Sequence, residues 1–292
     1  MNKRQTLLIE SVFYSATGHA IEAYKIATAV RRCNPDMDIW VLLNGNCPGV
    51  ELAECLPEIT KVVPIDIHLP RESVRKLPRE WDYILISSRS LHPIAIGGIT
   101  VFREELSSWV SARIARGICC AEGRLIEGDE RLPKFHSSSL RLHLPEHARS
   151  LGRSFVRKTA TVRISVLLGS ASESRTPPLP FRRRLFKSLV DEFRHIEIVL
   201  FGCLNRNTSY TLGVAQQDLD ELTREFPQVR NAFDLGLLNQ LAIAELCDCL
   251  LSPHTGMGIV IQCVGVPWSE PRTRGTSPLR AGVASGRSDL VG

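Results

Sequence analysis

Aromatic residues are scarce in this sequence, and no basic stripe is interleaved with those that are present. Phe, Trp and Tyr together make up 6% of the 292 residues. Proteins that bind nucleic acid typically combine a clustered basic surface with aromatic side chains on which bases stack. The net charge of +5 is only mildly basic, which fits small anionic ligands or an acidic membrane surface. We therefore do not expect nucleic-acid binding.

Long apolar runs are also missing. No stretch approaches the roughly 20 apolar residues that a membrane-spanning helix needs. The apolar run Leu7–Phe13 is too short for a secretory signal and contains Glu10. We expect no signal peptide and no transmembrane segment, while peripheral contact with a membrane is compatible with the charge.

The nine cysteines form no metal-binding or disulfide pattern. The spacing C-x-x-C does not occur, and the close pairs Cys119–Cys120 and Cys247-x-Cys249 are not zinc-ligand spacings. On a strand, Cys247 and Cys249 would face the same side as core residues. This odd, scattered set predicts reduced, mostly buried thiols in a cytoplasmic protein without a metal centre.

Strand-length apolar runs alternate with helical patterns along the first half of the chain. The predicted helices are Ala20–Arg32 and Val101–Gly117, and Leu91–Gly98 is predicted to be a loop. The predicted strands are Thr6–Tyr14, Ile39–Leu43, Thr60–Ile65 and Tyr83–Ser87. This order predicts a parallel sheet with right-handed crossovers.

The second half repeats the alternation. Helices are predicted after Pro180, at Gln216–Phe226 and at Leu241–Leu246. The predicted strands are Arg163–Leu168, Ile196–Gly202, Asn231–Asp234 and Asp248–Leu251. With 292 residues, 43% of them hydrophobic, the chain is long enough for two α/β domains, each with its own core. The predicted division is a first domain at 1–145, a basic linker at 146–162, a second domain at 163–268 and a disordered Gly/Ser/Arg/Pro-rich tail at 269–292.

The turn after Leu251 carries the strongest chemical signal. Thr255 is a good helix N-cap, and Gly256 and Gly258 allow backbone N–H groups to approach a ligand closely. A helix that begins there presents unpaired N–H groups and a partial positive charge, which suits a phosphate. The alternative is an ordinary strand-to-helix turn with glycine punctuation.

The stretch around this turn resembles the second domain of GT-B glycosyltransferases, nearest to the heptosyltransferase-like family. There, a Leu/Ala-rich helix and a strand lead into a Ser-x-Asp-Thr-Gly-x-x-His loop, followed by a helix and a Gly-x-Pro strand. In this sequence Leu241–Leu246 match the helix, Thr255 and Gly256 the loop, and Gly265–Pro267 the final signature. The resemblance is good over roughly Phe233–Trp268 and loose elsewhere.

In those enzymes the loop holds the donor diphosphate, so the resemblance implies donor binding by the turn residues His254, Thr255, Gly256, Met257 and Gly258. His254 stands where the family has an acidic residue, and the family's loop histidine falls at Gly258 or Ile259. Phosphate binding therefore carries over better than any single side-chain role.

The resemblance implies three further donor-side groups. The first loop of the second domain is rich in small residues in that family and offers hydroxyls and one cation, which correspond to Ser170, Ser172 and Arg175. Gly202 ends a strand before the polar loop Asn205–Gly213, which is similar to the segment that lines the nucleotide base pocket. The triplet Arg182–Arg184 is the rival cationic group, since cations in a first helical turn oppose the helix dipole and suit an anion or solvent.

The first domain has a Gly18–His19 turn at the carboxyl end of its first strand, where open α/β sheets bind ligands, so Gly18 is a further donor-binding candidate. It is similar to the Gly-His or Gly-Asp turn that opens the acceptor domain of many GT-B enzymes, where the polar residue is often the catalytic base. His19 is thus the first candidate for the base, Glu22 on the same helix face the second, and Glu10 the third. The alternative for His19 is an N-terminal helix residue without a catalytic role.

These observations favour a cytoplasmic, metal-independent glycosyltransferase. It would use a nucleotide-sugar as co-substrate, with no other cofactor, and a small-molecule or glycan acceptor with a hydroxyl or amine group. The resemblance also implies an incomplete second domain, because a complete GT-B protein would continue after Trp268 with further strand–helix units. Two alternatives remain: a non-catalytic nucleotide-phosphate-binding remnant, and a sugar-nucleotide epimerase. A dinucleotide-dependent dehydrogenase is disfavoured because no G-x-G-x-x-G follows the first strand.

Overall fold

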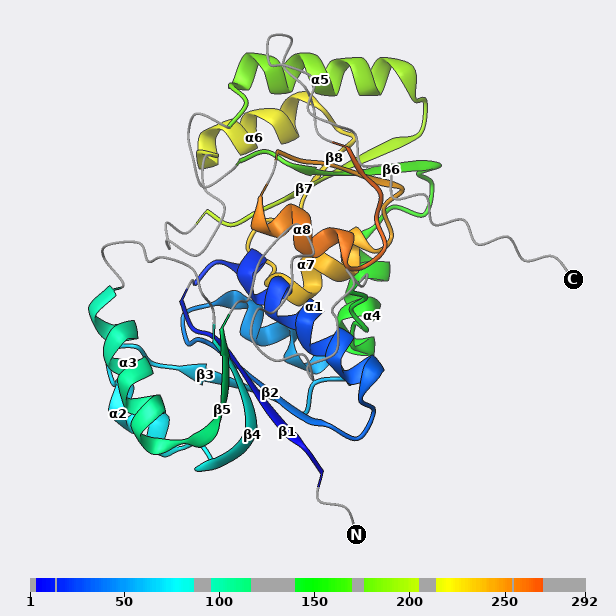
Figure 1. Cartoon of the computed structure of the whole chain (residues 1–292). Helices are drawn as coiled ribbons and strands as arrows, with labels where there is room; N and C mark the ends of the chain where they lie inside the picture. Colours follow the sequence, from blue (N-terminus) through cyan, green and yellow to red (C-terminus); the bar gives the residue numbers. More distant parts are fainter. Residues whose placement is uncertain are drawn as a thin grey trace, which may run out of the picture.

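The computed structural model describes residues 4–13, 15–86, 96–116, 140–169, 176–204, 214–253 and 255–269, with residues 96, 97, 115 and 116 described by their backbone alone. Two parallel sheets with flanking helices make up this part of the chain (Figure 1).

The first sheet has the strand order β3-β2-β1-β4-β5, and all its pairs are parallel. Its strands are β1 (Thr6–Ser11), β2 (Asp38–Asn44), β3 (Lys61–Ile65), β4 (Glu80–Ile86) and β5 (Ser111–Arg116). The helices of this half are α1 (Thr17–Cys33), the 3-10 helix η1 (Pro48–Cys55), α2 (Pro70–Arg75) and α3 (Ile96–Trp109). Nearly all of β1 is buried, as is typical of a central parallel strand covered on both faces.

The second sheet repeats the same arrangement in the order β10-β9-β6-β7-β8. Its strands are β6 (Val162–Leu167), β7 (Ile196–Phe201), β8 (Val229–Asn231), β9 (Cys249–Leu251) and β10 (Trp268–Ser269). The helices are α4 (Glu146–Phe155), which leads into it, α5 (Leu179–Glu192), α6 (Gln216–Glu225), α7 (Leu237–Ala244) and α8 (Gly256–Gln262). In chain order, both sheets run 3-2-1-4-5, the arrangement of doubly wound nucleotide-binding folds.

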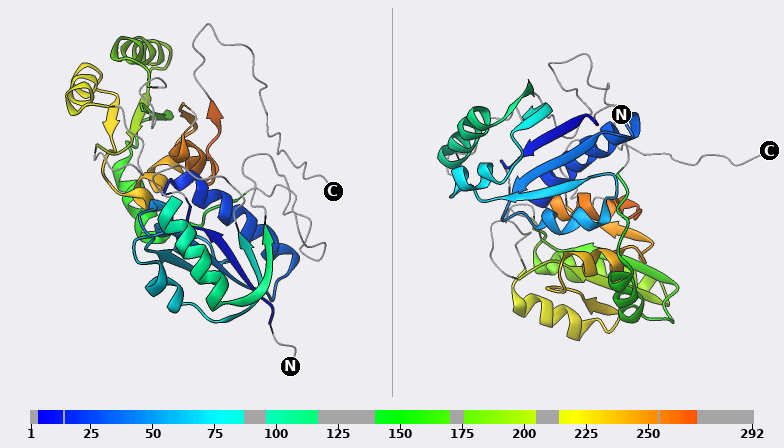
Figure 2. Two further views of the ribbon diagram at one scale, coloured as in Figure 1. Left: turned by 60° about the vertical axis from the view of Figure 1, so that its left-hand side comes forward. Right: turned by 90° about the horizontal axis from the view of Figure 1, so that it is seen from below.

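The helices form layers on either side of the two sheets. Helices α2 and α3 cover the outer face of the first sheet, and α5 and α6 cover that of the second (Figure 1). Helices α1, α7 and α8 lie between the sheets, as both views of Figure 2 also show. The largest hydrophobic cluster fills this middle layer and joins residues of β1 and α1 to residues of β7, α7 and α8. The inner faces of both sheets thus share one cluster, while the outer face of each sheet has a cluster of its own.

A short extended segment at residues 140–145 ties the middle layer together. Leu140, Leu142 and Leu144 are buried in the middle cluster. The backbone N–H of Leu142 donates to the carbonyl oxygen of Cys263 after α8 (2.9 Å), and that of His143 donates to Cys55 in η1 (2.9 Å). Adjacent amides thus bond to opposite halves of the molecule. On the far side of this segment, Arg149 of α4 donates to both carboxylate oxygens of Glu245 at the end of α7 (2.8 and 2.9 Å).

Most predicted elements are confirmed. Three are corrected, two in the first half and one at β8. The predicted helix Val101–Gly117 is instead α3 followed by β5, because the alternation after Trp109 suits a strand paired with β4. The predicted loop at Leu91–Gly98 overlaps the start of α3 at residues 96–98, and residues 91–95 lie outside the described ranges. The strand predicted at Asn231–Asp234 ends at Asn231, because the Asn231 side chain accepts from the N–H of Phe233 (2.8 Å) and Asp234 adopts a positive φ of 59°.

Two further predictions at the carboxyl end of the chain are corrected. Cys247 and Cys249 do not share a face: Cys247 precedes β9 and lies in the middle cluster, while Cys249 packs against the outer cluster. Ser269, predicted to begin a disordered tail, pairs with Leu251 as part of β10. The seven described cysteines are free thiols, and four of them are buried. No helix within the described ranges is long and apolar enough to cross a membrane.

Candidate functional site

The starts of α1 and α8 lie at the edges where sheets of this type generally bind ligands. The strand order reverses direction between β1 and β4 in one sheet and between β6 and β9 in the other. Open α/β sheets bind ligands at such switch points, outside the carboxyl ends of the strands. Helix α1 follows β1 and helix α8 follows β9, so both helix starts lie at switch points.

The two helix starts are in direct contact through Gly18 and Gly256. A Cβ atom added to Gly18 would lie 3.3 Å from the Cα of Gly256, and one added to Gly256 would lie 3.1 Å from the backbone nitrogen of Gly18. Neither position has room for a side chain without a shift of backbone. The acceptor-side turn and the phosphate turn predicted from the sequence therefore adjoin, and a ligand at this edge would lie beside the glycine contact.

Thr255 caps α8 as predicted. Its Oγ1 accepts a hydrogen bond from the backbone N–H of Gly258 (3.0 Å), and its backbone has the extended conformation of an N-cap residue. A Cβ on Gly258 would approach the Ser252 hydroxyl to 2.9 Å, so a larger residue at this position would require the Ser252 side chain to shift. Met257, the remaining described residue of the predicted turn, packs with part of its side chain against the middle cluster.

His19 and Glu22 form a hydrogen-bonded pair in the first turns of α1. The His19 Nδ1 lies 3.0 Å from the Glu22 Oε2, and the side chains are 26% and 21% exposed. Both are thus reachable from solvent yet held in place. The sequence placed the two residues on one helix face as rival candidates, and the structure brings them together as a single unit.

Gly202 follows β7 in a closely packed corner. Its N–H donates to the Gln240 side-chain oxygen (3.2 Å), and its carbonyl accepts from the Gln240 amide nitrogen (2.9 Å). A Cβ on Gly202 would lie 2.7 Å from the Phe233 ring. Gln240 is buried inside α7. It was not predicted from the sequence, although a polar residue among the apolar residues of a helix could have indicated it.

Several predicted donor-side residues lie outside the described ranges. These are Ser170, Ser172, Arg175, His254 and the loop Asn205–Gly213. Their assignment rests on the sequence alone.

Glu10 faces away from the edge shared by α1 and α8. Its carboxylate is fully buried and accepts from Nε (3.2 Å) and Nη2 (2.8 Å) of Arg103 on α3, and from the N–H of Val12 (3.2 Å). Leu8 and Val12, two residues away on either side, belong to the outer cluster beneath α2 and α3. Alternation along the strand therefore turns Glu10 to that outer face, and it is not a base candidate.

Arg182 and Arg183 are engaged by α6. Arg182 is buried and lies 3.2 Å from the Asp218 carboxylate, and burial lowers its pKa. Arg183 donates to Glu221 (2.7 Å) and Glu225 (2.8 Å). These bonds clamp α5 to α6 on the outer face of the second sheet, so the rival phosphate assignment of the pair is wrong.

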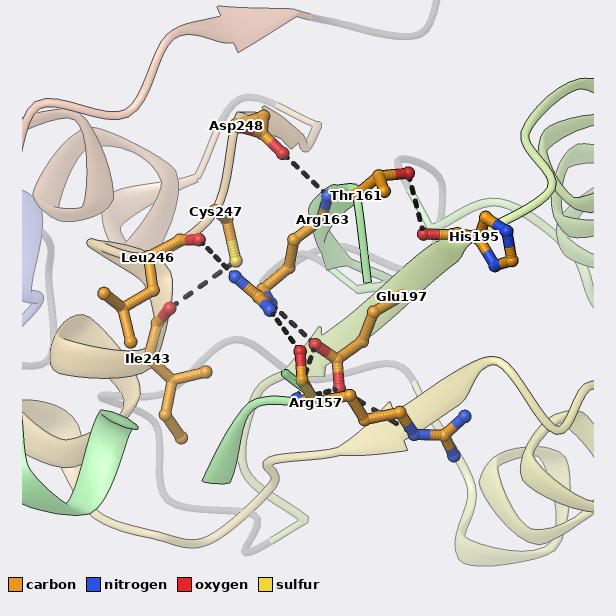
Figure 3. Close-up of polar contacts among 9 residues, drawn as sticks. All are labelled: Arg157, Thr161, Arg163, His195, Glu197, Ile243, Leu246, Cys247 and Asp248. Atoms are coloured by element: carbon orange, nitrogen blue, oxygen red, sulfur yellow. Dashed lines mark hydrogen bonds and ion pairs between the residues drawn. The ribbon is translucent and has the colours of Figure 1, made fainter. Parts of the chain in front are cut away.

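The arginines at the end of the predicted linker have a structural role. Glu197 of β7 is fully buried and accepts from the backbone N–H of Arg157 (3.0 and 3.1 Å) and from Nε of Arg163 (2.6 Å) (Figure 3). Arg163 also donates to the carbonyl oxygen of Leu246 (2.8 Å), and its N–H donates to the Asp248 carboxylate (2.7 Å). This network joins the amino ends of β6, β7 and β9, at the opposite edge of the sheet from the start of α8.

Two Asp-x-Asp triplets, which could hold a divalent cation through paired carboxylates, lie away from the start of α8. Asp36 and Asp38 stand at the amino end of β2. Asp218 and Asp220 belong to α6, where Asp218 pairs with Arg182 and Asp220 accepts from Gln216 (2.7 Å).

The fold is similar to those of several solved glycosyltransferases. Escherichia coli ADP-heptose LPS heptosyltransferase II is 14% identical, with a TM-score of 0.60 over 91% of this chain and 84% of that one. A family 9 glycosyltransferase from Veillonella parvula is 16% identical, with a TM-score of 0.64 over 92% and 82% of the two chains. E. coli heptosyltransferase WaaC with ADP is 10% identical, with a TM-score of 0.64 over 91% and 87%. No protein-family model matches the sequence, and no curated protein sequence matches it.

At these identities the likeness concerns the fold. The chain has a GT-B type architecture of two Rossmann-like halves, as the sequence predicted. The likeness covers most of the chain, well beyond the stretch Phe233–Trp268 that carried the resemblance in the sequence.

Proposed function

We propose that this protein is a glycosyltransferase that moves a sugar from a nucleotide-sugar donor to a hydroxyl or amine group of an acceptor. The observation that carries the proposal is the contact between Gly18 and Gly256, which brings the His19–Glu22 pair beside the capped start of α8. The GT-B fold supports the proposal, since the similar structures are glycosyltransferases.

The donor diphosphate would bind beside the start of α8. Backbone N–H groups there and the positive end of the helix dipole suit an anion, and Ser170, Ser172 and Arg175 would add hydroxyls and a cation. Two of the similar structures are of heptosyltransferases with ADP or an ADP-linked heptose analogue, so adenosine diphosphate and ADP-heptose are the first ligands to test.

His19 would accept the proton of the acceptor group as that group attacks the anomeric carbon of the donor. Imidazole ordinarily titrates near neutral pH, which suits a general base. The leaving diphosphate would be stabilised by oriented N–H groups and a cation rather than by a divalent metal. An excess of EDTA should therefore leave turnover unchanged, and restoration by Mg²⁺ of activity lost to EDTA would contradict metal independence.

The epimerase alternative is weaker, because the two carboxylates considered for it are both engaged. Glu10 is buried against Arg103, and Glu22 is bonded to His19.

Release of nucleoside diphosphate from a panel of nucleotide-sugars, with candidate acceptors, tests the proposal. We expect turnover with one donor class, and a loss of roughly 10²–10⁴-fold in kcat for His19→Ala, the usual contribution of a general base. His195→Ala is the matched control, because this exposed histidine precedes β7 at the opposite edge of the second sheet. Unchanged turnover in His19→Ala would show that another group is the base. No release from any donor by the folded protein would contradict the proposed transfer.

A further inference from the structure

We propose that Glu22 is a positioning residue for His19, and that the two side chains work as one acid–base unit. This inference rests on the proposed glycosyl transfer. His19 and Glu22 are then not rival bases: His19 is the base, and Glu22 positions it. The hydrogen bond of 3.0 Å from His19 Nδ1 to Glu22 Oε2 is the starting observation.

Helix geometry places Glu22, more than His19, on the side of α1 that faces α8. Glu22 is four residues after Gly18, so it lies on the same face of α1 as the glycine that contacts α8. Lys25, one turn further, is close enough to Cys263 after α8 to act on its pKa. Glu22 thus lies on the face of α1 that runs along α8. His19 is rotated about 100° from Gly18 around the helix axis and projects beside that face.

The bond determines which ring nitrogen can accept a proton. A carboxylate is a hydrogen-bond acceptor, so neutral His19 must carry its proton on Nδ1 and its lone pair on Nε2. In the transfer step, Nε2 takes the proton of the acceptor hydroxyl, and the hydroxyl oxygen forms its bond to the anomeric carbon. The bond from that carbon to the phosphate oxygen breaks, and its electron pair leaves with the nucleoside diphosphate. The resulting imidazolium is stabilised by the Glu22 carboxylate.

The tautomer of His19 provides a readout that does not require turnover. Long-range ¹H–¹⁵N spectra of ¹⁵N-histidine-labelled protein, with His19→Asn to assign the signal, report the tautomer of the neutral ring. We expect the Nδ1–H tautomer in the wild type and its loss in Glu22→Leu. Lys25→Leu, a change of a charged residue one turn along the same face, should leave the tautomer unchanged. A wild-type ring protonated on Nε2 would overturn the proposal.

Kinetics then test the catalytic role. Glu22→Leu should lower kcat toward the level of His19→Ala, while the dissociation constant of ADP changes by less than about threefold. Because residues that act as a unit have non-additive effects, the double variant should be no slower than His19→Ala alone. Multiplicative losses in the double variant would show that Glu22 acts independently of His19 and would overturn the proposal. If ADP and the other nucleoside diphosphates fail to bind while the Nδ1–H tautomer is present, the hydrogen bond stands and the proposed transfer, with the catalytic role of the pair, is overturned.

Discussion

Thr255 fixes the start of α8 with one hydrogen bond to Gly258, at the point where α8 contacts α1. Thr255→Val keeps the shape of the side chain and removes the bond. We expect a loss of about 1 kcal/mol in the free energy of unfolding, the usual cost of losing an N-cap, together with weaker nucleotide binding. Thr223→Val is the matched control, since its hydroxyl bonds to Leu219 within α6, away from the site. Equal nucleotide affinity in the two variants would show that the start of α8 is not the phosphate site.

The buried thiols give the protein a defined response to alkaline pH. Burial raises the pKa of Cys47 and Cys263 from 9.0 to about 11. Between these values the unfolded chain has lost protons that the folded chain keeps, so stability is fully retained below about pH 9 and falls as pH rises toward about 11. Each pKa unit corresponds to about 1.4 kcal/mol.

Urea unfolding at about pH 8 and about pH 10, on either side of the ordinary thiol pKa, tests this response. The wild type should lose more unfolding free energy across that interval than a Cys47→Ala/Cys263→Ala variant. An equal loss in both proteins would show that these thiols ionise alike in the folded and unfolded chains.

Single residues of the site were predictable where the signal was local. The N-cap pattern at Thr255 is read from a few consecutive residues. The predicted turn at Gly18–His19 is instead part of α1, which begins at Thr17. The Gly18–Gly256 contact and the Glu10–Arg103 pair were not predictable, because each joins segments that are distant in the sequence and brought together by the fold. The burial of Glu10 could have been inferred, since its neighbours Leu8 and Val12 share its face of the strand.

Helix α4 approaches α7 of the middle layer closely at a glycine. A Cβ on Gly152 of α4 would lie 2.7 Å from the Ala242 carbonyl oxygen of α7. Helix propensity alone predicts that Gly152→Ala stabilises α4 by about 1 kcal/mol. We expect the opposite, a loss of about 1–3 kcal/mol through overpacking, measured as a lower thermal midpoint. Ser150→Ala, an exposed change in the same helix, should have little effect. A stabilised Gly152→Ala variant would show that α4 and α7 can separate at no cost.

The network around Glu197 lies at the edge of the second sheet opposite the proposed nucleotide site, so we expect it to affect stability and not binding (Figure 3). Glu197→Gln leaves Arg163 facing a neutral partner in a buried position, and breaking such a pair costs about 3–5 kcal/mol. Because the network joins the amino ends of the strands, the nucleotide dissociation constant of the folded variant should equal that of the wild type. A large loss of nucleotide affinity at unchanged stability would show that the ligand binds at the amino ends of the strands, and not at the start of α8.

Elements with a regular period were predicted well, including the edge strand β3, whereas the edge strand β5 was not. Strand β5 was predicted as part of a helix, because its alternating Ser, Arg and Ala residues carry little apolar signal and its pairing with β4 decides its state. Helix α8 was predicted because the cap and glycines precede a short apolar run. The short pieces η1 and α2 have too few turns to show a period.

On the scale of the whole molecule, the two halves are joined through one apolar layer. Ten residues of α1 are buried, on more than one side of the helix, and α7 is apolar over most of its length. A helix that is apolar around its axis is covered on several sides, so the apolar residues around α1 and α7 are a sequence signal for the shared layer. The alternation of strands and helices was enough to predict two doubly wound sheets, while their placement against common helices depends on contacts between distant segments.

Thermal unfolding with and without ADP, GDP, UDP and dTDP is the most direct test of the proposed nucleotide site at the starts of α1 and α8. A ligand that binds the folded state alone adds about 2.7 kcal/mol of stability at a hundredfold excess over its dissociation constant. We predict a higher midpoint with one of the four nucleotides, ADP first, and a smaller rise in Thr255→Val. A cooperative transition that none of the four shifts would contradict the nucleotide-sugar site and with it the proposed glycosyltransferase.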